Sequence, residues 1–113
     1  MDQPVPHGQI IRLKKGAEEP YIILHKNAFP AVLDRIACSN ILNYSIFLDD
    51  GLLFGLYLYH GNSYQADMDA LAADHFTQEW WKLTAPMQVP FSFRKPGDWW
   101  AELGQSPHRA AGF

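Results

Sequence analysis

The fold class that the sequence predicts is α+β, with an antiparallel sheet that carries helices on one face. Two apolar runs flank an Asp-Asp-Gly turn in NYSIFLDDGLLFGLYLYHG, residues 43–61, which is typical of a β-hairpin. Apolar residues recur every three or four positions over Tyr21–Ala37, which indicates an amphipathic helix. At 113 residues the chain is expected to be a single domain, 1–113, with a structured core over 8–109.

The N-terminal third predicts one strand and one interrupted helix. In GQIIRLKK, residues 8–15, apolar residues alternate with basic ones, as in a strand with one buried face. Pro20 suits the first turn of the helix that follows, because an N-terminal turn does not need its missing N–H. Pro30 removes a backbone hydrogen bond from the helical segment. We therefore expect the helix over Tyr21–Ala37 to be kinked or broken there.

The middle of the chain predicts a hairpin followed by two helical segments. The hairpin strands are Ile41–Leu48 and Leu52–Tyr59, joined by the Asp-Gly turn. A helix is expected over Tyr64–Ala73, after a Gly-Asn-Ser stretch that can cap it. Asp74 is a good N-cap for a further helical segment that ends at about Leu83.

The C-terminal part predicts a proline-containing connector, Pro86–Asp98, and a last strand within Trp99–Arg109. Gly104 and Pro107 restrict that strand to an edge or an interface position. The element order is then the split βαβ arrangement of ferredoxin-like folds. Because helices cover only one face of such a sheet, the other face needs a cover, for which a second copy is suited. We expect a homodimer to which the Trp99-Trp100 tail contributes.

Composition and charge exclude several classes of protein. The net charge is −3 and the nine Lys and Arg residues are scattered, so no basic footprint for nucleic acid is present. No apolar run approaches the ~18 residues of a membrane span, and the N-terminus lacks the pattern of a secretory signal. We expect a soluble cytoplasmic protein. The lone cysteine, Cys38, lies among apolar residues and is expected to be buried.

The residue patterns also argue against metal and cofactor chemistry. The five histidines show neither HxxxH nor HxH spacing, and no carboxylate pair is placed to complete a metal site. The sequence has no glycine-rich phosphate loop and no GxSxG elbow. What remains is acid/base chemistry in an aromatic pocket, without a cofactor.

His25 and Tyr21 are the first candidates for that chemistry. They are four residues apart in the predicted helix, so both project from one face. Histidine titrates near neutral pH, and a tyrosine one turn away can hydrogen-bond the same ligand. A helical histidine on an apolar face is also a common packing residue, and spacing alone leaves both readings open.

Three further aromatic residues are candidates for ligand contact. Tyr44 follows Asn43 in a strand, where successive side chains face opposite ways, and the tyrosine is the better candidate to face the interior. Trp80 and Trp81 point about 100° apart on a helix, so one can pack while the other offers its indole N–H. Each of the three can equally be part of the core.

Three segments together resemble the L-rhamnose mutarotase family in order and spacing: IIRLKKGAEEPYIILHKNAFPAVL, NYSIFLDDGLLFGLYLYHG and DMDALAADHFTQEWWKLTAPMQVP. The resemblance covers about residues 8–90. It implies a ferredoxin-like dimeric α+β barrel that interconverts the α and β anomers of a 6-deoxy-L-sugar, L-rhamnose first, without a cofactor. It implies His25 as the catalytic residue and Tyr21, Tyr44, Trp80 and Trp81 as sugar-binding residues.

Other functions are compatible with the same pattern. They are an L-fucose mutarotase, a non-catalytic dimeric barrel that binds a small ligand, and a cofactor-free or haem-handling monooxygenase of the same fold. The enzyme interpretation requires Tyr21, His25, Tyr44 and the tryptophan doublet to surround one cavity.

Overall fold

The structure is a computed structural model that describes residues 3–103. Its elements in chain order are β1 (Val5–Leu13), α1 (Glu18–Lys26), α2 (Pro30–Cys38), β2 (Ile41–Asp49), β3 (Leu52–Tyr59), α3 (Tyr64–Ala73), α4 (His75–Thr84), a 3₁₀ helix (Ala85–Met87), β4 (Gln88–Val89) and β5 (Ala101–Glu102).

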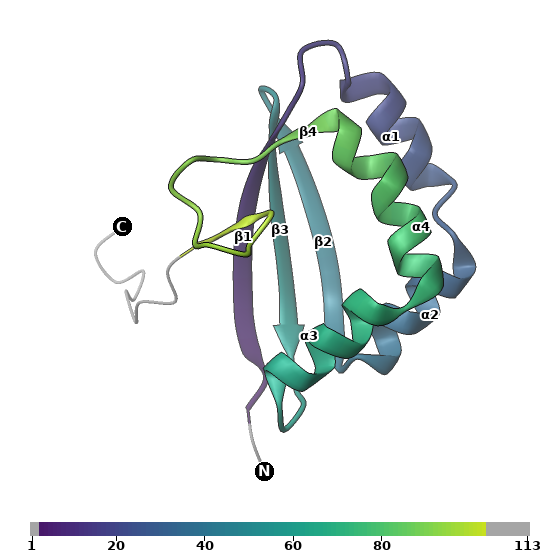
Figure 1. The fold of residues 1–113 in the computed structure, drawn as a ribbon, viewed down its shortest axis with the longest axis vertical. Helices are drawn as coiled ribbons and strands as arrows, with labels where there is room; N and C mark the ends of the chain where they lie inside the picture. The colour runs from purple at the N-terminus through teal and green to yellow at the C-terminus, as the bar shows by residue number, and fades with distance from the viewer. Residues whose placement is uncertain (1–2, 104–113) are drawn as a thin grey trace.

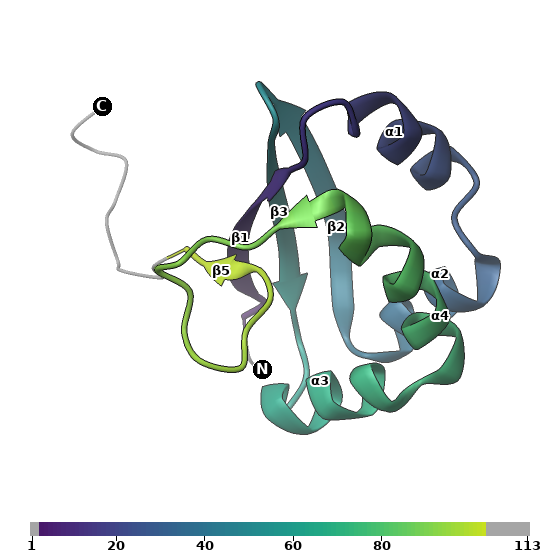
Figure 2. The same cartoon turned by 45° about the horizontal axis from the view of Figure 1, so that its top comes forward.

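The sheet has the strand order β2-β3-β1-β4, with β5 also paired to β1, and every pairing is antiparallel. This is the order expected of a ferredoxin-like fold. The strands curl into a half-barrel, and all four helices lie on its concave side (Figures 1 and 2). The predicted α+β class with helices on one face is therefore confirmed.

The strand boundaries differ from the prediction at both ends of the chain. β1 begins at Val5 rather than Gly8, because its pairing with β3 continues in register to Val5 opposite Tyr59. The predicted connector contains the two-residue strand β4, which pairs with the end of β1. The predicted last strand is present as β5, and its expected continuation over residues 104–109 lies outside the described residues.

The predicted break at Pro30 separates two helices. α1 ends at Lys26, and α2 begins with Pro30 at its first position. Phe29 has an extended backbone, with φ −62° and ψ 123°, because the proline ring disfavours helical geometry in the residue before it. Cys38 ends α2 and is exposed, so the expectation that it is buried is wrong. It lies about 120° around the helix from Val32, which is buried.

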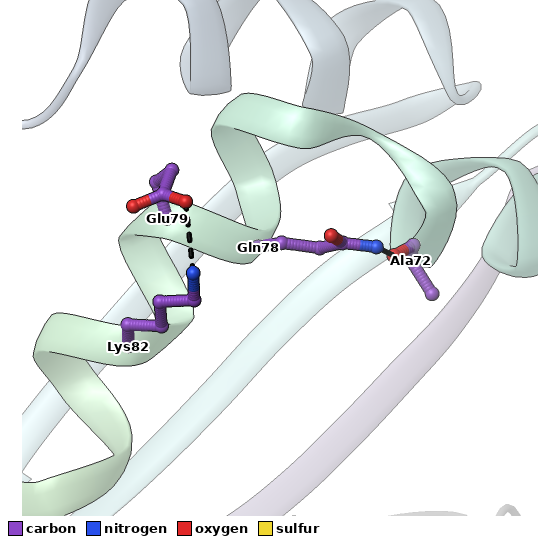
Figure 3. A network of polar contacts seen from close by, with 4 residues as sticks. All are labelled: Ala72, Gln78, Glu79 and Lys82. Carbon is purple, nitrogen blue, oxygen red and sulfur yellow. Dashed lines mark hydrogen bonds and ion pairs between the residues drawn. The ribbon is translucent and has the colours of Figure 1, made fainter.

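α3 and α4 meet at Asp74, which caps α4 as predicted. Its carboxylate accepts hydrogen bonds from the Thr77 backbone N–H and hydroxyl, both at 2.9 Å. On the exposed side of α4, Gln78 donates to the Ala72 carbonyl at 2.9 Å (Figure 3). The Lys82–Glu79 ion pair beside it is exposed, so its contribution to stability is small.

The core lies between the sheet and the helices. Ile11, Leu13, Tyr21 and Leu53 form its buried centre, and β2 and the C-terminal segment add partly buried residues. The opposite face of the sheet is apolar, and no helix within residues 3–103 covers it. Three side chains on that face are between 40% and 54% exposed, namely Leu42, Leu56 and Phe47.

Candidate active site

A hollow of about 290 Å³ lies between α1 and the sheet. Its size is close to the lower end of the ~300–1,000 Å³ range of small-molecule pockets, which suits a single sugar ring. Four lining residues come from α1 and three from β2 and β3: Tyr21, Ile22, His25, Lys26, Ile46, Leu48 and Leu53. The hollow therefore has one wall with polar groups and one aliphatic wall.

The helical spacing brings Tyr21 and His25 into contact, as expected. Their rings stack with centroids 4.2 Å apart, and His25 Nδ1 lies 3.0 Å from the Tyr21 carbonyl oxygen. A carbonyl oxygen can only accept a hydrogen bond, so Nδ1 carries the proton and donates it. In the neutral ring Nε2 then holds the lone pair. Within residues 3–103 Nε2 makes no hydrogen bond.

Trp80 encloses His25 on a second side. Its ring meets the imidazole edge-on at 5.2 Å, and Phe29 packs against the same indole at 5.2 Å. Trp80 is only 8% exposed. Burial lowers the pKa of His25, and the smaller effect of the hydrogen bond to the Tyr21 backbone opposes this. The imidazole is therefore neutral at neutral pH and can accept a proton.

The Tyr21 hydroxyl is held from the other direction by Gln88, a residue that sequence analysis missed. Gln88 Nε2 donates to the Tyr21 hydroxyl at 3.1 Å, and Gln88 Oε1 accepts from Trp99 Nε1 at 2.8 Å. Burial raises the pKa of Tyr21 to about 12, with the Gln88 hydrogen bond opposing. Tyr21 thus stays protonated and can act as a hydrogen-bond donor.

Tyr44 faces the interior while Asn43 is exposed. Its hydroxyl accepts from Gln9 Nε2 at 2.8 Å, its ring stacks on Tyr57 at 5.2 Å, and it is near enough to Tyr21 for a charge on one to affect the other. Burial raises its pKa. It lies on the same side of the sheet as the hollow but is not among the lining residues.

Trp81 lies apart from these groups. Its side chain is 44% exposed, and its ring contacts no other aromatic ring in the part of the chain that the structure describes. The structure thus brings Tyr21, His25 and Trp80 together, places Tyr44 near Tyr21, and leaves Trp81 at the surface. Of the five, Tyr21 and His25 line the hollow, so the expected single cavity surrounded by all five is not formed, and an enzyme interpretation rests on these two residues and on the comparisons below. A sugar contact of Trp81 stays a prediction.

A second aromatic group, which we call the His7 group, adjoins Tyr44 and was not predicted. His7 stacks between Tyr57 at 5.2 Å and Tyr64 at 4.3 Å, and the two tyrosine hydroxyls hydrogen-bond each other. Desolvation lowers the pKa of His7, and desolvation together with the Asp98 carboxylate raises that of Glu102 nearby. The alternation of His7, Gln9, Ile11 and Leu13 was the signal that β1 starts earlier and presents these residues inward.

Residues 3–103 contain neither a metal-binding cluster nor a membrane-spanning helix. No group of three or more His, Cys, Asp or Glu side chains there is arranged to hold a metal ion. No helix in that range is long and apolar enough to cross a membrane.

Two sequence comparisons with known proteins give the same family. A sequence model of the L-rhamnose mutarotase family matches residues 7–106. An L-rhamnose mutarotase of Flavobacterium johnsoniae is 30% identical over 83 residues, which are 72% of this chain and 75% of that protein.

Two solved structures share the fold. A crystal structure of an L-rhamnose mutarotase from Formosa agariphila has a TM-score of 0.70 at 20% identity, covering 92% of this chain and 97% of that one. A NIPSNAP family protein from Agrobacterium tumefaciens has a TM-score of 0.60 at 16% identity, covering 85% and 100%.

Proposed function

This chain belongs to the L-rhamnose mutarotase family of carbohydrate isomerases, and we propose that it interconverts the α and β anomers of L-rhamnose by opening the sugar ring, with His25 as the acid/base group. One observation carries the proposal. A neutral, partly buried imidazole with its Nε2 lone pair unused lines a hollow sized for one sugar, beside a protonated tyrosine.

The first half of the reaction moves one proton through His25. Nε2 removes the proton from the anomeric hydroxyl, O1 forms a double bond to C1, and the C1–O5 bond breaks. The resulting imidazolium gives the same proton to O5, the ring oxygen that leaves. A single nitrogen can serve both oxygens because both are bonded to C1. Positioned acid/base catalysis of this kind contributes ~10²–10⁴-fold.

The second half repeats these steps on the other face of the carbonyl. Rotation about the C1–C2 bond exposes that face, His25 takes the O5 proton, O5 attacks C1 and O1 regains the proton. All protons are returned and no atom changes its oxidation state overall. The reaction as proposed therefore uses no cofactor.

The aliphatic wall supports a 6-deoxy sugar as substrate. Ile46, Leu48 and Leu53 line the side of the hollow opposite Tyr21 and His25. A methyl group at C6 is buried favourably against such a wall, at about 0.8 kcal/mol per buried CH₂-sized group, whereas a hydroxymethyl group loses hydrogen bonds to water there. L-Rhamnose and L-fucose both carry this methyl group, and L-fucose is the second candidate.

Saturation-transfer NMR of the two anomeric signals tests the proposal. Purified protein is added to L-rhamnose at equilibrium, to L-fucose, and to L-mannose, which equals L-rhamnose except for its C6 hydroxyl. We expect accelerated exchange for L-rhamnose, less for L-fucose and least for L-mannose. Saturable binding of L-rhamnose without any acceleration would instead indicate a non-catalytic binding protein.

We also propose that two copies pair through the open face of the sheet. Leu42, Phe47 and Leu56 form an apolar surface there that no helix of residues 3–103 covers. A second copy presents the same surface, so pairing removes both from water with two-fold symmetry. Obligate homodimer interfaces are apolar in this way.

Sedimentation velocity at micromolar concentration tests the pairing. Wild-type protein should sediment as a dimer and Phe47→Glu as a folded monomer. Phe93→Glu is the matched control, because Phe93 is exposed in the connector before β5 and should leave the dimer intact. A monomeric wild-type protein would refute the pairing without touching the catalytic proposal.

A further inference from the structure

The chemistry of its partners fixes the orientation of the Gln88 amide. Gln88 is 5% exposed. The pairing of β4 with β1 places it opposite Leu13, on the helix side of the sheet. Trp99 Nε1 is a donor only, so the atom that faces it at 2.8 Å must be the amide oxygen. The amide nitrogen must then face the Tyr21 hydroxyl, at 3.1 Å.

This orientation determines what Tyr21 can offer to a ligand. Its hydroxyl oxygen accepts from Gln88, and its single hydrogen remains for another partner. That hydrogen has no acceptor among residues 3–103, while Tyr21 lines the hollow. Because Tyr21 lines the hollow, this hydrogen is the one that Tyr21 has left to donate to a sugar bound there.

We infer that Gln88, oriented by Trp99, is a positioning residue that makes Tyr21 a hydrogen-bond donor to the sugar, an inference that rests on the proposed function. Ring opening turns O1 from a hydroxyl, which donates and accepts, into a carbonyl oxygen, which only accepts. A donor fixed in advance at that oxygen favours the opening transition state over the closed ring, because nothing must reorient as the charge develops. Trp99, near the C-terminal end of the described residues, thereby determines whether Tyr21 donates or accepts a hydrogen bond in the site.

The polarity can be reversed by Gln88→Glu, which nearly conserves shape. The introduced carboxylate can only accept, so it accepts from both Trp99 and Tyr21 and turns the tyrosine hydrogen away from the sugar. The exchange rate at saturating sugar should fall about 10- to 100-fold, the factor expected when one buried donor is lost, with a smaller change in KM. When the introduced carboxyl is protonated it can donate again. The ratio of variant to wild-type rate should therefore rise as the pH falls, once the titration of His25, measured separately in each protein by NMR, has been divided out.

Three comparisons separate this role from a general structural one. Gln78→Glu makes the same chemical change on the exposed side of α4, where only the bond to the Ala72 carbonyl is lost (Figure 3), and should leave the rate unchanged. Trp99→Phe removes the indole donor, frees the amide to turn, and should lower the rate less than Gln88→Glu does. In a Tyr21→Phe background, Gln88→Glu should cause no further loss, because Gln88 acts through the missing hydroxyl.

The NMR signal of Tyr21 ¹³Cζ in the sugar-free protein gives a readout that needs no catalysis, because it responds to whether the hydroxyl donates or accepts. Gln88→Glu should shift it. An unchanged signal in a folded variant, or an equal loss of rate with Tyr21 and with Tyr21→Phe, overturns the inference. If Gln88→Glu does not fold, the same two measurements are made on Trp99→Phe. An unchanged Tyr21 ¹³Cζ signal, or an equal loss of rate with Tyr21 and with Tyr21→Phe, then overturns the inference. A shifted signal in a protein that accelerates no sugar exchange overturns the proposed function and leaves the hydrogen-bond assignment standing.

Discussion

The two adjacent tryptophans of α4 should respond very differently to truncation. Trp80 is 8% exposed and packs against His25 and Phe29, both at 5.2 Å, whereas Trp81 is 44% exposed. Replacing a buried tryptophan by alanine costs about 3–5 kcal/mol, because transfer energy is lost and a cavity remains. Trp81→Ala removes a ring that is already half in water, so we expect about 1 kcal/mol or less. The difference is therefore at least about 2 kcal/mol.

Urea and thermal unfolding, followed by circular dichroism, measure this difference. For a chain of this size about 1 kcal/mol corresponds to about 4 °C in Tm, so Trp80→Ala should lower Tm by about 12 °C or more. Trp81→Ala should lower it by about 4 °C at most. Equal losses from the two substitutions would show that the side of α4 facing the sheet has been wrongly assigned, and with it the packing around His25.

Three further outcomes are expected. Burial lowers the pKa of His25. Because the neutral ring is the base, the exchange rate should rise with pH and reach half its maximum below pH ~6.5. A half-maximum above that value in the pH–rate profile would contradict this. Asp74→Ala removes the cap of α4 and should cost about 1 kcal/mol in urea unfolding, with Asp69→Ala, inside α3, as the comparison; equal losses would argue against capping. Gly55→Ala places a Cβ 3.0 Å from Gln9 Cγ, so the bond from Gln9 to Tyr44 should weaken and shift the Tyr44 ¹³Cζ signal; an unchanged signal would show that Gln9 moves without losing the bond.

The elements that the sequence predicted well depend on local signals. The hairpin turn is one, since Asp50 and Gly51 have φ of 51° and 74°, the left-handed geometry that an Asp-Gly pair favours. The break before Pro30 is another, because the proline ring acts on the residue next to it. The contact of Tyr21 with His25 follows from one helical turn. All of these involve residues within four positions of each other.

The features that sequence analysis missed depend on distant pairings. Gln88 lies 67 residues from Tyr21, and its place in the site follows from β4, a strand too short to show alternation. The sequence also did not decide which side of α4 is buried. Phe76 and Leu83 lie on its exposed side and are as apolar as residues of a core. Only the packing of α4 on the sheet decides between Trp80 and Trp81.

The rate of anomer exchange in the His25→Gln variant tests the central claim most directly. Glutamine keeps a polar side chain of similar reach but cannot take up a proton, and His60→Gln, at an exposed position after β3, is the matched control. With L-rhamnose in the saturation-transfer experiment, His25→Gln should lose ~10²–10⁴-fold of the protein's acceleration, with an unchanged circular dichroism spectrum, while His60→Gln should keep the wild-type rate. A folded His25→Gln variant that exchanges the anomers as fast as the wild-type protein would contradict the account.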